Sequence, residues 1–263
     1  MSFLGGMRQI DLNCDMGESR AAIQDGTQEA LMPFFSSVNV ACGGHAGDEK
    51  SMLVTLRKAA HYKLAVGAHP GYPDRESFGR LELDMPGEAV SDFVFQQVNA
   101  LAEIAAVQGV LVTHVKPHGA LYNQAVKNRG LARAIADGVA RWSREVVLVG
   151  LAGSPMLDVF REAGFTVAAE AFADRRYEAD GTLRSRKLSD AVIQNPEEAA
   201  RQALQIVEHG TVTASGGSEV QVNVQVNAQT ICLHSDTPGA LAIAKAVGQT
   251  LRGAGIGLRA LSR

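Results

Sequence analysis

The sequence predicts an α/β fold in which parallel strands alternate with helices and close into a barrel of TIM type. The chain of 263 residues is 46% hydrophobic, which suits one domain with a sizeable core. Short apolar runs alternate along it with longer segments of helical spacing, the order that produces a parallel sheet. About seven such units fit a closed barrel better than a two-lobed fold, and a doubly wound open sheet is the alternative.

The apolar runs are expected to form the strands of this barrel. They are rich in Val, Ile, Leu and Ala, as strands buried on both faces are. Polar or glycine-containing segments separate each run from the helix that follows it. The predicted strands are 8–14, 37–42, 64–68, 110–115, 146–151, 165–170 and 229–234.

The helices between the strands have recognisable ends. One begins after Asp48, a good N-cap residue, and another covers 87–108, between a proline and a glycine. A third covers 196–209, which opens with proline and glutamates and closes on histidine, as the helix dipole favours. The last lies within 237–255.

We expect one catalytic barrel domain over 1–263, with one insertion. Residues 211–228 alternate Val with Gln and Asn around a Gly-Gly pair. This period-2 pattern predicts an exposed β-hairpin rather than another strand and helix of the barrel.

The composition argues against several classes of protein. A net charge of −3 gives no electrostatic reason to expect a nucleic acid or a membrane surface as partner. No run of about 18 apolar residues occurs, and the first residues do not form a secretory signal, so we expect a cytoplasmic protein. Three cysteines without CxxC spacing (Cys14, Cys42 and Cys232) favour buried free thiols over disulfides or metal thiolates.

The first predicted strand carries polar residues at every second position. Asp11, Asn13 and Asp15 share one parity, and apolar residues share the other. Side chains alternate between the two faces of a strand, and the outer face of a barrel strand meets apolar helices. These three side chains are therefore expected to point into the barrel.

Histidines gather at the predicted carboxyl ends of the strands, where parallel α/β folds bind ligands. Taken singly, each could be structural, as His61 and His209 in late helical turns are expected to be. Burying such groups costs on the order of several kcal/mol unless they are paired or bind a ligand. Their coincidence therefore predicts a polar catalytic or metal-binding mouth. Five of the seven histidines lie there: His45, His69, His114, His118 and His234.

The residue types at this mouth suit hydrolysis. Three histidines with a carboxylate form a ligand set for zinc or another divalent cation. Asp15 or Glu18 could act as general base, and the spacing does not decide between them. Lys116 is expected to neutralise an anionic substrate or intermediate, while His114 lies deeper in the strand. No GxxxxGK[ST] sequence occurs, so we expect no P-loop nucleotide site.

Six ordered motifs that span nearly the whole chain resemble the LamB/YcsF family. The resemblance implies a seven-stranded β/α barrel of the glycoside hydrolase and deacetylase type. It also implies the A subunit of a prokaryotic 5-oxoprolinase, which opens 5-oxo-L-proline to L-glutamate with ATP and with partner subunits B and C. The motifs are DLNCDMGE (11–18), NVACGGHAGD (39–48), VGAHPGYPD (66–74), VKPHGALYN (115–123), FADRRYEADGTL (172–183) and TICLHSDTP (230–238).

The chain differs from the usual motifs of the family that it resembles at three positions. Gly44 stands where an aromatic residue is usual, Arg20 where phenylalanine is usual, and Leu81 where a second arginine is usual. These departures bear on substrate detail more than on the fold.

The strand-end pattern and the resemblance together give an expected site. ATP is expected as a co-substrate bound by the partner subunits, because this chain lacks a nucleotide motif. Two other functions stay open: a stand-alone metal-dependent amide or sugar hydrolase or deacetylase, and a non-catalytic subunit that binds and delivers substrate. The expected residues are Asp15, Glu18, Lys116 and His118 for catalysis, His45, His69 and His118 for a divalent metal, and Asp11, Asn13, Asn39, Gly43, Tyr72, Arg80 and Asp236 for substrate.

Overall fold

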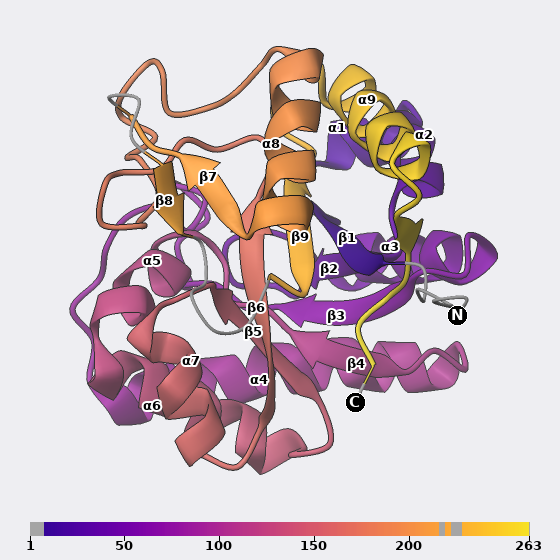
Figure 1. Ribbon diagram of the computed structural model, residues 1–263. Helices are drawn as coiled ribbons and strands as arrows, with labels where there is room; N and C mark the ends of the chain where they lie inside the picture. The colour runs from indigo at the N-terminus through magenta and orange to yellow at the C-terminus, as the bar shows by residue number, and fades with distance from the viewer. Residues whose placement is uncertain (1–7, 216–218, 222–227, 263) are drawn as a thin grey trace, which may run out of the picture.

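A closed barrel of seven parallel strands forms the centre of the computed structural model, which describes residues 8–215, 219–221 and 228–262 (Figure 1). β1 pairs with β2 on one side and with β9 on the other, which closes the barrel. Every strand agrees with a predicted apolar run to within two residues at each end, so the predicted barrel is confirmed and an open sheet is excluded. The strands are β1 (Gln9–Met16), β2 (Ser37–Ala41), β3 (Ala65–His69), β4 (Val112–Val115), β5 (Val147–Leu151), β6 (Thr166–Phe172) and β9 (Thr230–His234).

Helices surround the barrel (Figure 1). None of the helices within the described part of the chain combines the length and apolar character needed to cross a membrane. A short strand, β10 (Gly257–Leu258), pairs with the start of β1. The helices are α1 (Arg20–Gln24), α2 (Thr27–Leu31), η1 (Met32–Phe34), α3 (Glu49–His61), α4 (Gly87–Val107), α5 (Gly119–Lys127), α6 (Arg129–Trp142), α7 (Pro155–Glu162), α8 (Pro196–His209) and α9 (Ala240–Gly253).

The helix ends follow the local chemistry that the sequence indicated. Asp48 caps α3 by accepting a hydrogen bond from the Ser51 N–H, and the Ser51 hydroxyl accepts one from the Asp48 N–H. α8 begins at a proline and ends at Gly210, which adopts φ 67° in the left-handed region. The reciprocal cap on α3 fixes the end of the loop that carries His45 away from β2.

The main hydrophobic core lies between the barrel and its helices. A small second cluster, Val147, Val149 and Ala168, has the inward parity of Glu170. Leu12, Cys14 and Met16 of β1 are fully buried in the main core. The three cysteines are free and buried, as expected. The opposite face of β1 points inward, as its parity predicted, and the barrel interior that receives it is unusually polar.

The segment expected to form a β-hairpin over 211–228 is described only in part. β7 (Thr211–Thr213) pairs antiparallel with β8 (Glu219–Gln221) beside α8 (Figure 1). Residues 216–218 and 222–227 of this expected hairpin lie outside the described residues.

Candidate active site at the carboxyl end of the barrel

The deepest polar group inside the barrel is the Asp11 carboxylate. It accepts hydrogen bonds from the hydroxyls of Ser36, Ser37 and Thr230 at 2.7, 2.8 and 2.6 Å. Burial outweighs these contacts and raises the pKa of Asp11 to about 6. Since Ser37 and Thr230 are the first residues of β2 and β9, Asp11 lies at the end of the barrel opposite the mouth.

A second polar layer lies above Asp11. Asn39 donates to the side-chain oxygens of Asn13 and Asp15, both at 2.8 Å, and its Oδ1 accepts from His114 Nε2 at 2.9 Å. The His114 ring enters the barrel because position 67 is glycine: a Cβ on Gly67 would lie 2.2 Å from His114 Nε2. Burial, and then the Lys116 charge, lower the pKa of His114 to about 3. This layer supports the residues at the mouth.

The Lys116 ammonium is enclosed by acceptors. Its Nζ lies 3.0 Å from Asp15 Oδ1, 2.8 Å from Glu170 Oε1, 3.3 Å from Asn13 Oδ1 and 3.1 Å from Cys232 Sγ. Burial opposes its charge, but the neighbouring Asp15 and Glu170 carboxylates help to hold the pKa of Lys116 well above its usual value. Because an ammonium has three donors, Lys116 has none left for a ligand.

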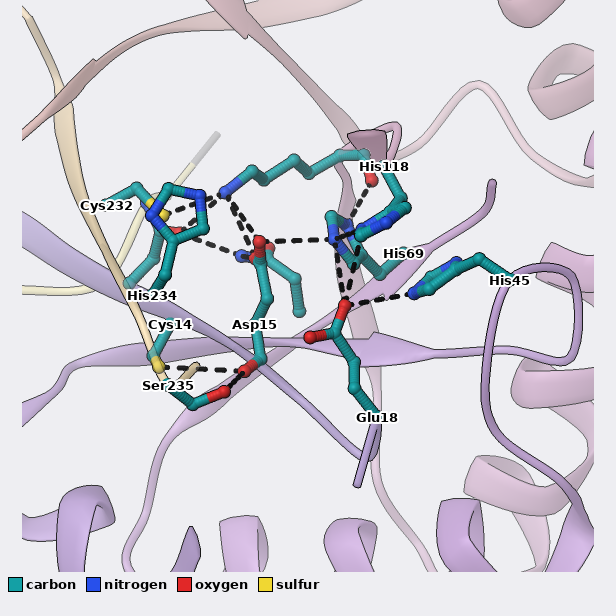
Figure 2. Close-up of polar contacts among 12 residues, drawn as sticks. Cys14, Asp15, Glu18, His45, His69, His118, Cys232, His234 and Ser235 are labelled. Atoms are coloured by element: carbon teal, nitrogen blue, oxygen red, sulfur yellow. Dashed lines mark hydrogen bonds and ion pairs between the residues drawn. The ribbon is translucent and has the colours of Figure 1, made fainter. Parts of the chain in front are cut away.

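Three histidines converge on the Glu18 carboxylate at the mouth (Figure 2). Glu18 Oε1 lies 2.9 Å from His45 Nε2, 3.3 Å from His118 Nδ1 and 3.8 Å from His69 Nε2. Burial opposes the Glu18 charge, but hydrogen bonds to His118 and His45 lower its pKa. All four side chains offer a ligand atom within 4.8 Å of the others. This is a compact nitrogen and oxygen donor set of the kind that binds zinc and similar cations.

Backbone carbonyls orient two of these rings. His69 Nδ1 lies 2.7 Å from the Lys116 carbonyl, and His118 Nε2 lies 2.9 Å from the Phe78 carbonyl. When both nitrogens donate to those carbonyls, the lone pairs of His69 Nε2 and His118 Nδ1 face each other at 3.0 Å. Two lone pairs at that distance repel unless a proton or a cation lies between them. Outer carbonyls of this kind are typical of histidines that bind metal.

The backbone that holds His118 is strained. Phe78 has φ 56°, in the left-handed region that costs a non-glycine residue on the order of 1–3 kcal/mol. Gly79 follows with φ 63°, and a Cβ there would lie 2.6 Å from the Cβ of His45. Strain of this size persists where the surrounding structure requires it, here to aim the Phe78 carbonyl at His118.

The charges at the mouth also fit a cation. Asp15 and Glu170 are buried carboxylates, Glu18 is a mostly buried third, and Lys116 supplies one positive charge against them. Burying uncompensated charge is costly, so a divalent cation beside Glu18 would balance this set. A second group of metal-binding side chains, Asp15, Cys232 and His234, has the Lys116 ammonium among it and does not suit a cation.

His234 and Asp174 form a pair on the side of Asp15 away from Glu18. His234 Nδ1 is 3.0 Å from Asp174 Oδ1, and Asp174 also accepts from the Thr237 hydroxyl at 2.7 Å. Burial opposes the Asp174 charge, but His234 lowers the pKa of Asp174 to about 2. The His234 ring stacks on Phe172 with centroids 5.5 Å apart, and its Nε2 makes no hydrogen bond within the described part of the chain. This arrangement fixes the ring and leaves Nε2 for a ligand.

A cavity of about 760 Å³ opens over these groups. Seven lysines and arginines and four carboxylates line it among the described residues, although the chain as a whole is net negative. Of the predicted site residues, the cavity wall includes Asp15, Glu18, His69, Arg80, Lys116, His118 and Asp236.

The remaining predicted residues lie elsewhere, each for a structural reason. His45 stacks on His118 behind the cavity wall, with ring centroids 3.5 Å apart. Tyr72 points away from the mouth and hydrogen bonds to Gln124 at 2.7 Å, and the Gly43 carbonyl accepts from Arg75 on the outside. The others sit below the mouth, inside the barrel: Asp11, Asn13 and Asn39.

Four residues at the mouth were given no individual role in the sequence analysis, and only His234 was expected there. Glu170 lies in an otherwise apolar strand and pairs with Lys116, and Asp174 and His234 pair with each other. Arg175 lines the cavity. A single buried carboxylate in an apolar strand was the available signal for Glu170. The other pairings join β6 and β9, far apart in sequence.

A model of a known protein family matches this sequence, in agreement with the resemblance carried by the six motifs. The model for the LamB/YcsF family matches residues 10–263. The chain belongs to the LamB/YcsF family. A protein from Chloroflexus aggregans, named as the A subunit of 5-oxoprolinase, is 51% identical over 96% of this chain and 99% of its own length. One of the same name from Tolumonas auensis is 46% identical over 97% of this chain and all of its own.

Solved structures agree with membership of the LamB/YcsF family. The lactam utilization protein from Thermus thermophilus superposes with a TM-score of 0.86 at 40% identity, covering 96% of this chain and all of that one. A putative cellobiose-phosphate cleavage protein from Enterococcus faecalis reaches a TM-score of 0.54 at 15% identity over 95% of this chain and 96% of its own, which shows a shared fold only.

Proposed function

We propose that this chain is the subunit of an ATP-dependent 5-oxoprolinase that opens the lactam ring of 5-oxo-L-proline to give L-glutamate. The names of the family relatives support the reaction. One observation of the site supports hydrolysis in this chain: Asp15 and His234, within 4.8 Å of each other, face the cavity beside the Glu18 histidine cluster. A base and an acid next to a candidate cation site are the groups that breaking an amide bond requires.

The lactam is a poor electrophile, which explains the need for ATP. We place phosphorylation of the lactam oxygen in partner subunits B and C, because this chain has no nucleotide motif. One water then opens the ring to a glutamyl acyl phosphate, and a second releases phosphate from it. The cavity of this chain would receive the activated ring.

Asp15 is the better placed of the two candidate bases. Both carboxylates line the cavity, but Glu18 lies among three histidines, whereas Asp15 meets only His69 of these, with Oδ2 at 3.2 Å from Nε2 (Figure 2). Asp15 Oδ2 also lies 3.4 Å from Lys116 Nζ. Asp15 takes a proton from water as the water oxygen bonds to the ring carbon. His234, held at Nδ1 by Asp174, gives a proton to the ring nitrogen as the carbon–nitrogen bond breaks.

Glu18, His45, His69 and His118 would hold a divalent cation. Such a cation would polarise the oxygen on the ring carbon and favour deprotonation of the attacking water. Lys116 keeps Asp15 ionised and in position and does not contact the substrate.

Reconstitution tests the catalytic role. The purified chain is mixed with its partner subunits, and ATP-dependent glutamate release is followed. We expect Asp15→Asn to abolish release while the complex still assembles, and Asp158→Asn, at a surface pair with Arg161, to leave release unchanged. Equal release with and without this chain would exclude the proposal, and full release by Asp15→Asn would leave the chain a binding role only.

Elemental analysis tests the cation site independently of activity. We expect about one divalent ion per purified chain, lost in Glu18→Gln and His118→Ala. His61→Ala is the matched control, because His61 is the last residue of α3 and lies outside the cavity wall. The same metal content in all four proteins would remove the ion from the mechanism.

A further inference from the structure

The cavity lacks an obvious partner for a negatively charged substrate, despite its basic lining. Lys116 has all its donors occupied by Asp15, Glu170, Asn13 and Cys232. Arg184 pairs with Glu178 and Asp190, both at 2.8 Å. The charged groups of Lys116 and Arg184 are therefore paired with protein groups and are not available to a ligand.

Three further cations at the rim are also shared with carboxylates. Arg80 and Arg186 both bind Asp236, so one carboxylate serves two guanidinium groups. Lys127 lies 3.5 Å from Asp180 at an exposed position. Lys187 is exposed on a long flexible side chain, which makes it a poor preorganised site.

Arg175 differs from all of these. It follows β6, lines the cavity, and is only 4% exposed. Its guanidinium donates to the Arg184 carbonyl at 2.6 Å and the Ala191 carbonyl at 3.4 Å, and it meets no carboxylate within 4.0 Å among the described residues. The neighbouring Asp174 turns to His234 instead. Two of the five guanidinium N–H groups are thus used, and three have no protein acceptor in the described part of the chain.

Burying a guanidinium without a counter-ion costs free energy, and the lowered pKa of Arg175 reflects this. Burial, and then the Arg186 charge, lower its pKa to about 10. The group remains charged at neutral pH, held rigidly by two carbonyls at the cavity wall. A planar fork of this kind suits an oxyanion bound by two parallel hydrogen bonds.

We propose that Arg175, with the charge of Arg186 beside it, binds an oxyanion of the substrate at the wall of the cavity. The ligand is a small molecule with a carboxylate or a phosphate group, and its reacting carbon lies toward Asp15 and Glu18. Identifying that oxyanion as the carboxylate of 5-oxo-L-proline, or as the phosphate of its activated form, rests on the proposed function.

Binding to the full-length chain tests this assignment by calorimetry. The probes are 5-oxo-L-proline, 2-pyrrolidinone, which is the same lactam without the carboxylate, and inorganic phosphate. Arg175→Gln should raise the Kd for 5-oxo-L-proline about 10- to 100-fold, which is the range for losing a hydrogen bond to a charged group. The same substitution should change the Kd for 2-pyrrolidinone by less than about 3-fold, because that ligand has no oxyanion.

Two further variants separate charge recognition from loop structure. Arg175→Lys keeps the charge and should recover part of the discrimination between the two lactams. Arg176→Gln is the matched control, since Arg176 is the next residue but pairs with Glu198 at 2.7 Å away from the cavity. It should bind every probe as the unaltered chain does.

The outcomes are distinct. Loss of lactam discrimination supports a carboxylate at Arg175, and unchanged discrimination with weaker phosphate binding supports a phosphate there. An equal loss for both lactams and phosphate would assign Arg175 to holding the loop, and no loss for any probe would remove it from the site; either result overturns the inference. If neither lactam binds but phosphate binds in an Arg175-dependent way, the oxyanion at Arg175 is a phosphate, and the reconstitution assay decides the proposed function separately.

Discussion

The carboxylate of Asp11 should destabilise the folded protein at neutral pH, so Asp11→Asn should be more stable there than the unaltered chain. Asp11 is 1% exposed and receives hydrogen bonds from three hydroxyls, but no cation pairs with it among the described residues. An amide keeps an acceptor and a donor in the same shape without the charge. The hydroxyls of Ser36, Ser37 and Thr230 can rotate to suit it.

The sign follows from the direction of the pKa shift. Asp11 has a pKa of about 6 in the folded chain against 3.8 for the ordinary carboxyl, so the folded state binds a proton that the unfolded state has lost. Stability therefore falls as the pH rises from about 4 to about 6 and stays lower above that. A shift of about 2 units corresponds to about 3 kcal/mol, because each unit is worth about 1.4 kcal/mol.

Urea unfolding of both proteins between pH 4 and pH 8 measures this difference. The advantage of Asp11→Asn should grow by about 2–3 kcal/mol across the range, with the value at pH 4 as the internal control. Ser36→Ala, which removes one donor to the carboxylate, should move the transition to higher pH. Parallel stability curves for Asp11→Asn and the unaltered chain would refute the assignment of Asp11 as a buried carboxyl with a raised pKa.

Three other substitutions test the site and its support. His234→Gln should reduce ATP-dependent glutamate release by the complex about 10²- to 10⁴-fold, the usual contribution of a general acid, and leave the metal content unchanged. Lys116→Met leaves the Asp15 and Glu170 carboxylates without their buried partner, so urea unfolding should show a loss of about 3–5 kcal/mol. Gly67→Ala places a methyl group against the His114 ring and should cost about 1–3 kcal/mol in the same assay.

The barrel was predictable because its signals are local. Each strand is a short apolar run, and the parity of residues 9–16 alone placed Asp11, Asn13 and Asp15 inside. The position of the mouth followed from the rule that parallel strands present their carboxyl ends together. That rule gathered His69 and His118 correctly, and both line the cavity.

The partner and the role of each residue within the site could not be predicted in the same way. Glu18 meets His45 and His118, whereas Asp15 is the carboxylate closer to His69. This sharing depends on the path of the chain after β1, and three residues of sequence separation do not determine it. Lys116 looked free to bind an anion because its partner Glu170 lies 54 positions away in another strand. Tyr72 sits in a motif with His69, yet its side chain turns toward α5, where Gln124 binds it.

The charges of the cavity argue that the substrate is oriented by two poles of opposite sign. At one pole, three carboxylates exceed the single ammonium of Lys116, which favours a cation and the activated ring carbon. At the other, Arg175 and the two arginines that share Asp236 leave an excess of positive charge. A ligand with an oxyanion at one end and a lactam at the other carries groups that match both poles. Under the proposed function, such a ligand would present its carbon–nitrogen bond toward Asp15 and His234, the proposed base and acid.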